Sequence, residues 1–461
     1  MFKKIEIWIL YLVIILSILF AIAFGSLVRQ ELVGETKLGW ASKTALFLSE
    51  MHVIVKKSLM NTNRREDRFP SLEGFVGTPN AQESYLLLSR YDGNLKQGIV
   101  ELVDLTNFKV LHVWNPDIDA LNDLLEQEDE FETLLSSFDD KSSYFRHAKL
   151  TAGGGLLFKE FTPLRKIDAC SNLIFQNTSD TFHHSIEIDI EGNIWVTSHL
   201  YPPSLPLKKI GIDPSENGGF LDDAIVKLSS DGETLYEKSV SQIFIENGLE
   251  YLLFSVGASH STGRGDFDSD PIHLNDIQPV DFDSQYWKKE DVFLSLRHQS
   301  MVLLYRPSSN KIIWKGTGPF FHPHDVDILD DHRISVFNNN SKNFIDGDIV
   351  DGNNQVIIYD FKTNEYSTYL SESLKKQDVR TVTEGRSQIL PNGDLFVEET
   401  NYARTLYFNA DGSMRWSHFN RADGFAYAVG WSRILYTQDD IQICLLYTSD
   451  AADEGLGVDL G

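Results

Sequence analysis

The chain has 461 residues, with 41 Lys or Arg against 67 Asp or Glu, so its formal charge at pH 7 is −26. An excess of acid this large argues against a general nucleic-acid-binding protein, because contacts to phosphates need a positive surface. Hydrophobic residues make up 42% and aromatic residues 12%, which excludes a disordered chain. Two cysteines exclude a disulfide scaffold and a cysteine-rich zinc module.

Residues 1–25 predict a transmembrane anchor or a signal segment. Two lysines at positions 3 and 4 precede an apolar run from Trp8 to Phe24, close to the ~20 residues that cross a bilayer. Lysines on that side favour a cytoplasmic N-terminus, with the rest of the chain across the membrane. The competing interpretation is a cleaved signal peptide, since the Ala-Ile-Ala at 21–23 has the form of a cleavage site. Either way, the remainder is expected to be exported.

Two further segments predict helices, and the C-terminus predicts a non-native tail. Residues 26–75 are expected to form a helical stalk, and 117–140 a helix with one apolar and one acidic face. Residues 444–461 resemble a translated sequencing-library adapter and lack periodicity; the alternative is a genuine disordered tail. Without that tail Cys170 would be the only cysteine, and no internal disulfide could form.

Residues 76–443 predict an all-β domain. Short runs of Val, Ile, Phe, Tyr and Trp alternate with turn pairs such as Asp-Gly and Asn-Gly. About six imperfect units of roughly 40 to 60 residues follow one another, which is typical of a β-propeller. Residues 427–437 would supply the strand that closes the ring. We therefore expect a six-bladed propeller with an N-terminal transmembrane helix and short helical insertions; an array of β-sandwiches is the structural alternative.

Histidines gather near the starts of the predicted blades. Six of the 13 histidines lie in four short segments, together with an asparagine and an arginine: His183, His184, His273, Asn275, Arg297, His298, His322 and His324. Residues at blade starts line the central channel of a propeller, so we expect these side chains to converge. Neighbouring residues in a strand face opposite ways, so only one of His183 and His184 points inward, and we favour His184.

This set of residues suits transfer of an anionic group. Imidazole can act as a nucleophile and as a proton carrier near neutral pH, and Arg offers a planar fork to the oxygens of phosphate or sulfate. One histidine would attack, another would protonate the leaving oxygen, and Arg297 would hold the remaining oxygens. The chain lacks a glycine-rich phosphate loop, which argues against a nucleotide donor.

Two other classes of function remain open at this point. A buried His324 could hydrogen-bond to blade backbone, and His322 could lie at the channel rim, in a propeller that only binds an envelope or extracellular ligand. Alternatively, His322 and His324 share one face of a strand, as zinc ligands do, and Asp325 and Asp327 could complete a metal-dependent hydrolase or lyase.

The histidine segments resemble the bacterial arylsulfotransferase (arylsulfate sulfotransferase) family over roughly residues 80–440. The similar motifs are His-His-Ser-Ile-Glu-Ile-Asp at 183–189, Asp-Pro-Ile-His-Leu-Asn at 270–275, Phe-Leu-Ser-Leu-Arg-His-Gln-Ser at 293–300, Ile-Ile-Trp-Lys at 312–315, His-Asp-Val-Asp-Ile-Leu at 324–329 and Val-Phe-Asn-Asn at 336–339. The resemblance implies a six-bladed propeller. It also implies transfer of a sulfuryl group from an aryl sulfate ester to a phenol, through a sulfated histidine and without a nucleotide, metal or cofactor.

The resemblance also implies roles for individual residues. His324 would be the nucleophile, His184 and His273 would act as acid–base or oxyanion-binding groups, and Asn275 and Arg297 would hold the sulfuryl oxygens. We expect three further histidines to help bind substrate: His183, His298 and His322.

The chain departs from the well-studied family members, which are exported soluble enzymes that often have a disulfide and an N-terminal β-domain. It resembles a membrane-tethered branch. The expected location is therefore the bacterial inner membrane, crossed once, with residues 5–24 in the lipid bilayer and the bulk of the chain periplasmic or extracellular. The expected partners are an aryl sulfate donor and a phenolic acceptor, and not nucleic acid.

Overall fold

The computed structural model describes residues 6–32, 39–59, 63–125, 144–205, 220–254, 270–344 and 347–436. The chain divides into two compact units, residues 1–64 and 65–461. The predicted tail at 444–461 lies outside the described residues. So does most of the helix predicted at 117–140, of which the structure shows α3 (Ile118–Asp123). Cys170 is exposed and forms no disulfide.

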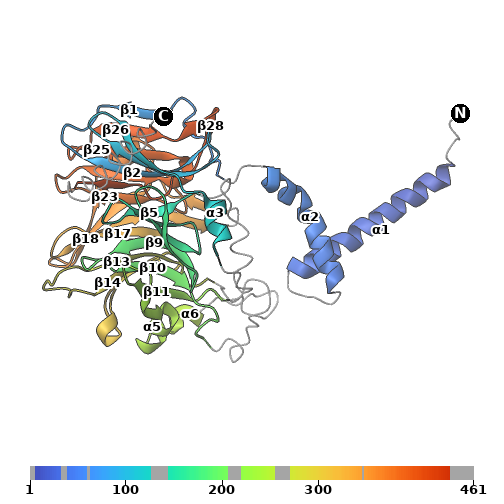
Figure 1. The fold of residues 1–461 in the computed structure, drawn as a ribbon. Coiled ribbons are helices and arrows are strands. Elements are labelled where there is room, and N and C mark those ends of the chain that lie inside the picture. The colour runs from blue at the N-terminus through green and yellow to red at the C-terminus, as the bar shows by residue number, and fades with distance from the viewer. Residues whose placement is uncertain are drawn as a thin grey trace, which may run out of the picture. The chain divides into compact units, whose positions relative to one another are not determined.

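The first unit consists of two helices, α1 (Ile7–Leu32) and α2 (Trp40–Leu59), drawn in blue in Figure 1. Residues 7–30 of α1 are long and apolar enough to cross a membrane. α1 is therefore a candidate membrane anchor or signal sequence. α2 lies within the predicted helical stalk, residues 26–75, but that range also includes the start of β1 (Gly74–Gly77).

The second unit is a six-bladed β-propeller, as predicted, with six sheets of four or five strands (Figure 1). We number the blades in chain order. Blade 1 contains β2 (Tyr85–Asp92), β3 (Gln97–Asp104), β4 (Lys109–Trp114) and β29 (Arg433–Leu435). Blade 2 contains β5 (Arg146–Leu150), β6 (Leu156–Lys159), β7 (Leu164–Ile167) and β8 (Leu173–Asn177). Blade 3 contains β9 (Thr181–Ile188), β10 (Ile194–His199), β11 (Asp223–Leu228) and β12 (Thr234–Ser239).

The other three blades repeat this order. Blade 4 contains β13 (Leu274–Pro279), β14 (Val292–Leu296), β15 (Met301–Arg306) and β16 (Lys311–Gly316). Blade 5 contains β17 (Pro323–Ile328), β18 (Arg333–Asn338), β21 (Gln355–Asp360) and β22 (Glu365–Tyr369). Blade 6 contains β23 (Arg386–Ile389), β24 (Leu395–Glu399), β25 (Arg404–Phe408), β26 (Met414–Phe419) and β1 (Gly74–Gly77).

Short elements join these strands. A hairpin of β19 (Ser341–Phe344) and β20 (Gly347–Val350) is inserted in blade 5, and β27 (Arg421–Ala422) pairs with β28 (Phe425–Ala426). The helical insertions are α5 (Val240–Glu246), α6 (Tyr251–Phe254), α7 (Ser371–Lys376) and the 3₁₀ turns Pro307–Ser309 and Thr400–Tyr402.

Two strands join the ends of the propeller domain. β29 pairs antiparallel with β2, from Tyr85 opposite Leu435 to Leu87 opposite Arg433, and so completes blade 1 with a strand from the C-terminal end. This confirms the closing strand predicted within residues 427–437. β1 in turn adds to β26, with Gly74 opposite Phe419. The ring is therefore closed by pairing in two neighbouring blades.

The hydrophobic core lies between blades. Six clusters of buried apolar residues each combine side chains from two adjacent blades. Trp416 is an example: it is fully buried between blades 6 and 1, stacks on Tyr407 at a ring-centroid distance of 5.2 Å, and donates its indole N–H to Asn80 Oδ1 at 3.0 Å. Strands such as β14 are buried on both faces because successive side chains face opposite neighbouring blades.

Candidate active site

The innermost strand of each blade carries a residue of positive φ within a few residues of its start. Five of the six are not glycine; the set is His147, His184, His273, His322, Gly385 and Trp431. Positive φ is unfavourable for such residues and is concentrated at functional sites. Pairing register shifts within four of these strands, β5, β9, β13 and β17, and bulges of this kind re-aim side chains. Four of the residues of positive φ are thus histidines, and each lies beside a bulge in its strand.

Five imidazole rings form a continuous row from blade 2 to blade 5. The ring centroids of His147 and His184 are 6.4 Å apart, and those of His184 and His273 are 5.0 Å apart. His298, from the turn between β14 and β15, lies 4.5 Å from His273 and 6.2 Å from His322. We call these five residues, with His324 and Arg297, the histidine cluster. The sequence prediction that distant histidine segments meet at one site agrees with this geometry.

His324 lies on β17 in this cluster. It is 1% exposed, and neither ring nitrogen makes a hydrogen bond of normal geometry to the described residues. Burial, together with the charges of Arg297 and His273, holds the pKa of His324 well below its ordinary value. Its imidazole is therefore neutral at pH 7, with an unprotonated nitrogen available to attack an electrophile.

Arg297 lies at the end of β14, and its guanidinium is oriented by two contacts. Nη1 donates to His298 Nε2 at 2.6 Å, and Nη2 donates to Asp348 Oδ2 at 2.9 Å. The residue is 7% exposed, and its Nε makes no hydrogen bond to the described residues. The β19–β20 hairpin supplies Asp348 and also Ser341, whose Oγ lies 2.8 Å from His322 Nδ1. An insertion in blade 5 thus orients two residues of the cluster.

Asp270 fixes the orientation of two further imidazoles. Its Oδ2 lies 2.5 Å from His273 Nδ1, and its carbonyl oxygen lies 2.5 Å from His298 Nδ1. Because His298 Nε2 accepts from Arg297, its Nδ1 is the protonated nitrogen. A carboxylate on Nδ1 likewise leaves Nε2 of His273 to exchange protons, the arrangement of a carboxylate-oriented base.

Two predicted substrate-binding residues make contacts within the protein instead. The ring of His183 lies 5.0 Å from that of His184, but its Nε2 lies 3.2 Å from Asp223 Oδ1, and the ring stacks on His199 at 3.9 Å. His184 is the histidine of this pair that joins the row, as favoured from the sequence. Asn275 Nδ2 donates to the carbonyl of Pro323 at 2.8 Å, which ties blade 4 to the residue just before His324.

Several residues of the site could not be singled out from the sequence. His147 lies in the weakest of the repeat units, and only its place near the start of β5 could have indicated it. Trp431 packs on His147, with ring centroids 4.0 Å apart. Lys159 is 1% exposed and donates to the carbonyl of His184, and burial holds its pKa well below the ordinary value. No motif marks a lysine in that position.

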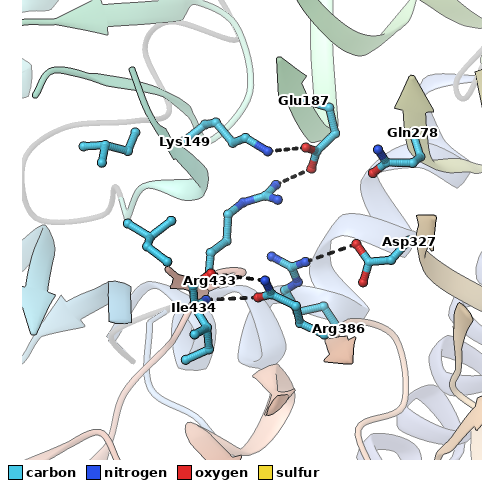
Figure 2. Close-up of a pocket in the computed structure, with 10 residues that line it drawn as sticks. Lys149, Glu187, Gln278, Asp327, Arg386, Arg433 and Ile434 are labelled. Carbon is cyan, nitrogen blue, oxygen red and sulfur yellow. Dashed lines mark hydrogen bonds and ion pairs between the residues drawn. The ribbon is translucent and has the colours of Figure 1, made fainter. Parts of the chain in front are cut away.

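A cavity of about 300 Å³ lies beside the innermost strands (Figure 2). Each blade contributes one polar side chain, two to five residues further along its innermost strand than the residue of positive φ, and Arg386 adds a seventh. The seven are Lys149, Glu187, Gln278, Asp327, Arg386, Gln388 and Arg433. Glu187 accepts from both Lys149 and Arg433, the latter at 2.5 Å, and Arg386 Nη2 lies 3.9 Å from Asp327 Oδ1. The basic side chains of this cavity therefore come from blades 6, 1 and 2 and pair with carboxylates from blades 3 and 5.

The pKa values of the two carboxylates of this cavity shift in opposite directions. Burial alone would raise the pKa of Glu187, but Arg433 and Lys149 outweigh it and hold that pKa at about 2. Burial, and then the charge of Asp325, raises the pKa of Asp327 to about 7. Glu187 is thus ionised throughout the physiological range, whereas Asp327 takes up a proton near neutral pH.

Replacing Asp327 by Asn is expected to stabilise the protein above pH 7. The folded state holds a proton on Asp327 between about pH 4 and 7 that the unfolded chain releases, so this carboxyl lowers stability progressively as the pH rises through that window. The amide cannot ionise, so we expect a gain of about 1–3 kcal/mol at pH 8 and none at pH 4. Denaturant unfolding at both pH values measures it. The exposed Asp231→Asn is the control, and equal gains at the two pH values would contradict the assignment.

The comparisons with known proteins identify the family. The family model described as Arylsulfotransferase (ASST) matches residues 151–421, more than half of the chain. No curated protein matches at a significant level.

Among solved structures, a Bacteroides caccae protein of unknown function is 10% identical, covers 77% of this chain and 100% of its own, and has a TM-score of 0.45. The WD40 propeller domain of Doa1 is 10% identical, with 80% and 96% covered and a TM-score of 0.39. A Staphylococcus aureus virginiamycin B lyase is 10% identical, with 79% and 99% covered and a TM-score of 0.37. The family match spans blades 2 to 6 and every residue of the histidine cluster except His147, and the chain belongs to the arylsulfotransferase family.

Proposed function

We propose that this protein moves a sulfuryl group from an aryl sulfate ester to a phenolic acceptor through a sulfated His324, without a nucleotide donor. The observation that supports it most directly is the state of His324: a buried, neutral imidazole near Arg297 and His273, whose ring nitrogens make no hydrogen bond of normal geometry to the described residues. Family membership supports the reaction class. The donor and acceptor classes and the covalent step are the parts that we propose.

In the first step, a ring nitrogen of His324 attacks the sulfur, the N–S bond forms, and the bond between sulfur and the aryl oxygen breaks. Negative charge gathers on the departing oxygen, which takes a proton from His273. Burial holds the pKa of His184 well below its ordinary value, so this neutral imidazole would bind an oxygen of the sulfuryl group through its N–H. Arg297 faces the non-bridging oxygens. Its guanidinium is already fixed by His298 and Asp348, so little reorganisation is needed as charge develops.

In the second step, the phenolic oxygen of the acceptor attacks the same sulfur and the N–S bond breaks. The histidine that gave up its proton takes the proton of the acceptor, so the site returns to its starting state. The orientation of His273 by Asp270 leaves Nε2 free for both transfers. Group transfer, rather than loss of sulfate to water, requires that the acceptor reach the sulfated His324 before water does.

The location proposed for this reaction is outside the cytoplasm. The apolar helix α1 supports either an anchor or a signal sequence, and both lead to export of the propeller. We propose the anchored form, in a membrane-tethered branch of the family.

Incubation of the detergent-solubilised full chain with an aryl sulfate and a different phenol tests the function. We expect released donor phenol and newly sulfated acceptor in equal amounts, measured by liquid chromatography and mass spectrometry. Release of free sulfate with no sulfated acceptor would indicate a hydrolase instead. Binding without turnover would indicate a propeller that only binds its ligand.

Replacing Arg297 by Ala is expected to lower kcat about 100-fold or more, the usual effect of removing one donor to a developing negative charge. The loss should be larger in kcat than in KM, because the charge on the sulfuryl oxygens peaks in the transition state. Steady-state kinetics with an aryl sulfate measures both constants. Arg333→Ala, at an exposed arginine paired with Asp330, is the control and should leave both unchanged. A loss confined to KM would show that Arg297 only binds substrate.

A further inference from the structure

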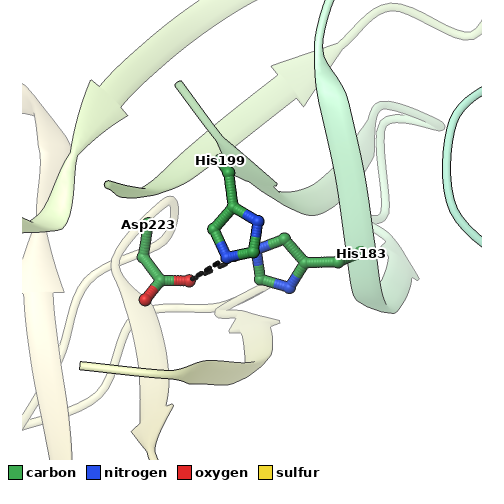
Figure 3. Close-up of side chains that lie close together, drawn as sticks. All are labelled: His183, His199 and Asp223. Atoms are coloured by element: carbon green, nitrogen blue, oxygen red, sulfur yellow. Dashed lines mark ion pairs between the residues drawn. The ribbon is translucent and has the colours of Figure 1, made fainter. Parts of the chain in front are cut away.

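Three side chains in blade 3 bring their ligand atoms together beside the histidine row, with the rings of His183 and His184 5.0 Å apart (Figure 3). His183, His199 and Asp223 come from β9, β10 and β11, three strands that neighbour one another in one sheet. His199 is directly opposite Asp223 in the β10–β11 pairing, and His183 is opposite Thr197, two residues before His199. The three side chains therefore stand on one face of a rigid sheet.

The distances fit one metal ion. His183 Nε2 lies 3.2 Å and His199 Nε2 3.5 Å from the same oxygen, Asp223 Oδ1, and the three ligand atoms all lie within 4.8 Å of one another. A tetrahedral metal with bonds of about 2.0–2.1 Å holds its ligand atoms roughly 3.3–3.4 Å apart. The two imidazoles stack at 3.9 Å with planes 22° apart, so both direct Nε2 toward Asp223 from one side.

The site also contains buried polar atoms without hydrogen bonds. Asp223 is fully buried and His183 is 2% exposed, yet neither oxygen of Asp223 nor His183 Nε2 has a hydrogen bond of normal geometry to the described residues. Among the described residues only the imidazoles of His183 and His199, at 3.2 and 3.5 Å, are there to balance this buried carboxylate, and a metal ion bound between the three groups would replace that pairing.

Thr197 can hold the second ring nitrogen of His183 when the first binds a metal. The Thr197 hydroxyl donates to the carbonyl of His183, so its oxygen is available as an acceptor, and His183 Nδ1 lies 3.4 Å from it. With a metal bound at Nε2, Nδ1 carries the proton and can donate it to the Thr197 hydroxyl. This is the state in which a histidine binds a metal, with its second nitrogen held by another group.

We propose that His183, His199 and Asp223 bind one divalent transition metal of the zinc class, at a site separate from the reacting His324. Two imidazoles and one carboxylate suit Zn²⁺ or a similar ion, whereas Ca²⁺ and Mg²⁺ prefer oxygen ligands. The site goes beyond the proposed sulfotransferase function. The bound metal would have a positioning role. It would hold β9 at His183, the residue before His184, which has an unfavourable φ of 41°.

An exposed ligand gives access to the site. The side chain of His199 is 23% exposed, and it also lines an apolar pocket of about 240 Å³ with residues such as Tyr201 and Phe220. A fourth ligand, such as water, can therefore reach the metal from this side. Another group of potential ligands, Asp270, His273 and His298, belongs to the histidine cluster and is the main competitor for any metal that binds.

Metal content measured on the purified full chain tests the proposal. We expect about one zinc ion per chain by inductively coupled plasma mass spectrometry, lost on dialysis against a chelator and restored by Zn²⁺. Reloading with Co²⁺ should give the intense visible bands of a four-coordinate site. Thermal unfolding should shift to lower temperature without metal and recover with it, because the ion binds only the folded chain.

Variants locate the ion. His199→Ala and Asp223→Asn should each abolish binding of Co²⁺ and Zn²⁺, while His112→Ala, at a half-buried histidine that contacts the carbonyl of Ala169, should retain it. Binding that survives His199→Ala and is lost in His298→Ala would place the metal in the histidine cluster and overturn the proposal. Metal content well below one per chain in the wild type, with no uptake of Co²⁺, would overturn it even if the variants fail to fold.

Discussion

A His324→Ala variant is expected to lose sulfuryl transfer, with kcat/KM falling at least about 1,000-fold, as when other covalent nucleophiles are removed. Alanine leaves no atom at this position to form the N–S bond, and two neighbouring imidazoles of the cluster are engaged elsewhere: His298 with Arg297 and His322 with Ser341. Steady-state release of phenol from an aryl sulfate measures the loss. Mass spectrometry of the peptide that contains residue 324, after rapid acid quench, should show a sulfuryl adduct in the wild type alone.

A matched control separates this loss from damage to the fold. His418 is also a buried histidine, 7% exposed, but lies on β26 in blade 6 and packs against Phe75. His418→Ala should retain transfer in proportion to the folded protein that remains. Phenol release that persists at wild-type rate in His324→Ala would contradict the assignment of the nucleophile, while transfer itself would still stand.

Removing β29 is expected to unfold the propeller. A chain that ends at Ser432 lacks the strand that pairs with β2, the contact of Arg433 with Glu187 and the buried Ile434. Blade 1 would keep an unpaired inner edge, and the ring would open. The loss should approach the whole stability of a typical domain, about 5–15 kcal/mol. Circular dichroism during heating and size-exclusion chromatography measure it.

A chain that ends at residue 443 is the control for this truncation. It lacks only the segment predicted to be non-native and should unfold at the same temperature as the full chain. Cooperative unfolding of the 1–432 chain at that same temperature would show that ring closure by β29 contributes little.

The blades could be predicted from the sequence because their signals are local. Each strand is a run of β-branched and aromatic residues, and each turn has its own Gly, Asn or Asp. The pairing of β1 with β26 could not be predicted in this way. Its Gly-Phe-Val-Gly is too short to stand out, and its partner lies at the other end of the chain. The hairpin of β19 and β20 could not be predicted either, because the strand pattern of blade 5 continues on both sides of it.

The site was predictable where a residue type and its place in the blade coincide. His184, His273 and His324 satisfy both conditions, and the structure brings them to the same cluster. Asp270 and Asp348 could not be found, because acidic residues are abundant in a chain with 67 of them and only their three-dimensional neighbours distinguish these two. The buried Asp223 could not be predicted for the same reason.

The residues of positive φ have a consequence for the symmetry of the site. In blade 6 this place is taken by Gly385, at φ 120°, and a Cβ there would come within 2.5 Å of Thr381 Cγ2 and 2.8 Å of Phe337 Cε1. Steric crowding thus bars a sixth side chain, while Trp431 fills the place in blade 1. Imidazoles occupy only one arc of a nearly sixfold frame. The six blades repeat around one axis, but the ring of residues at their starts is therefore chemically asymmetric, with imidazoles on one side and Trp431 and Gly385 on the other.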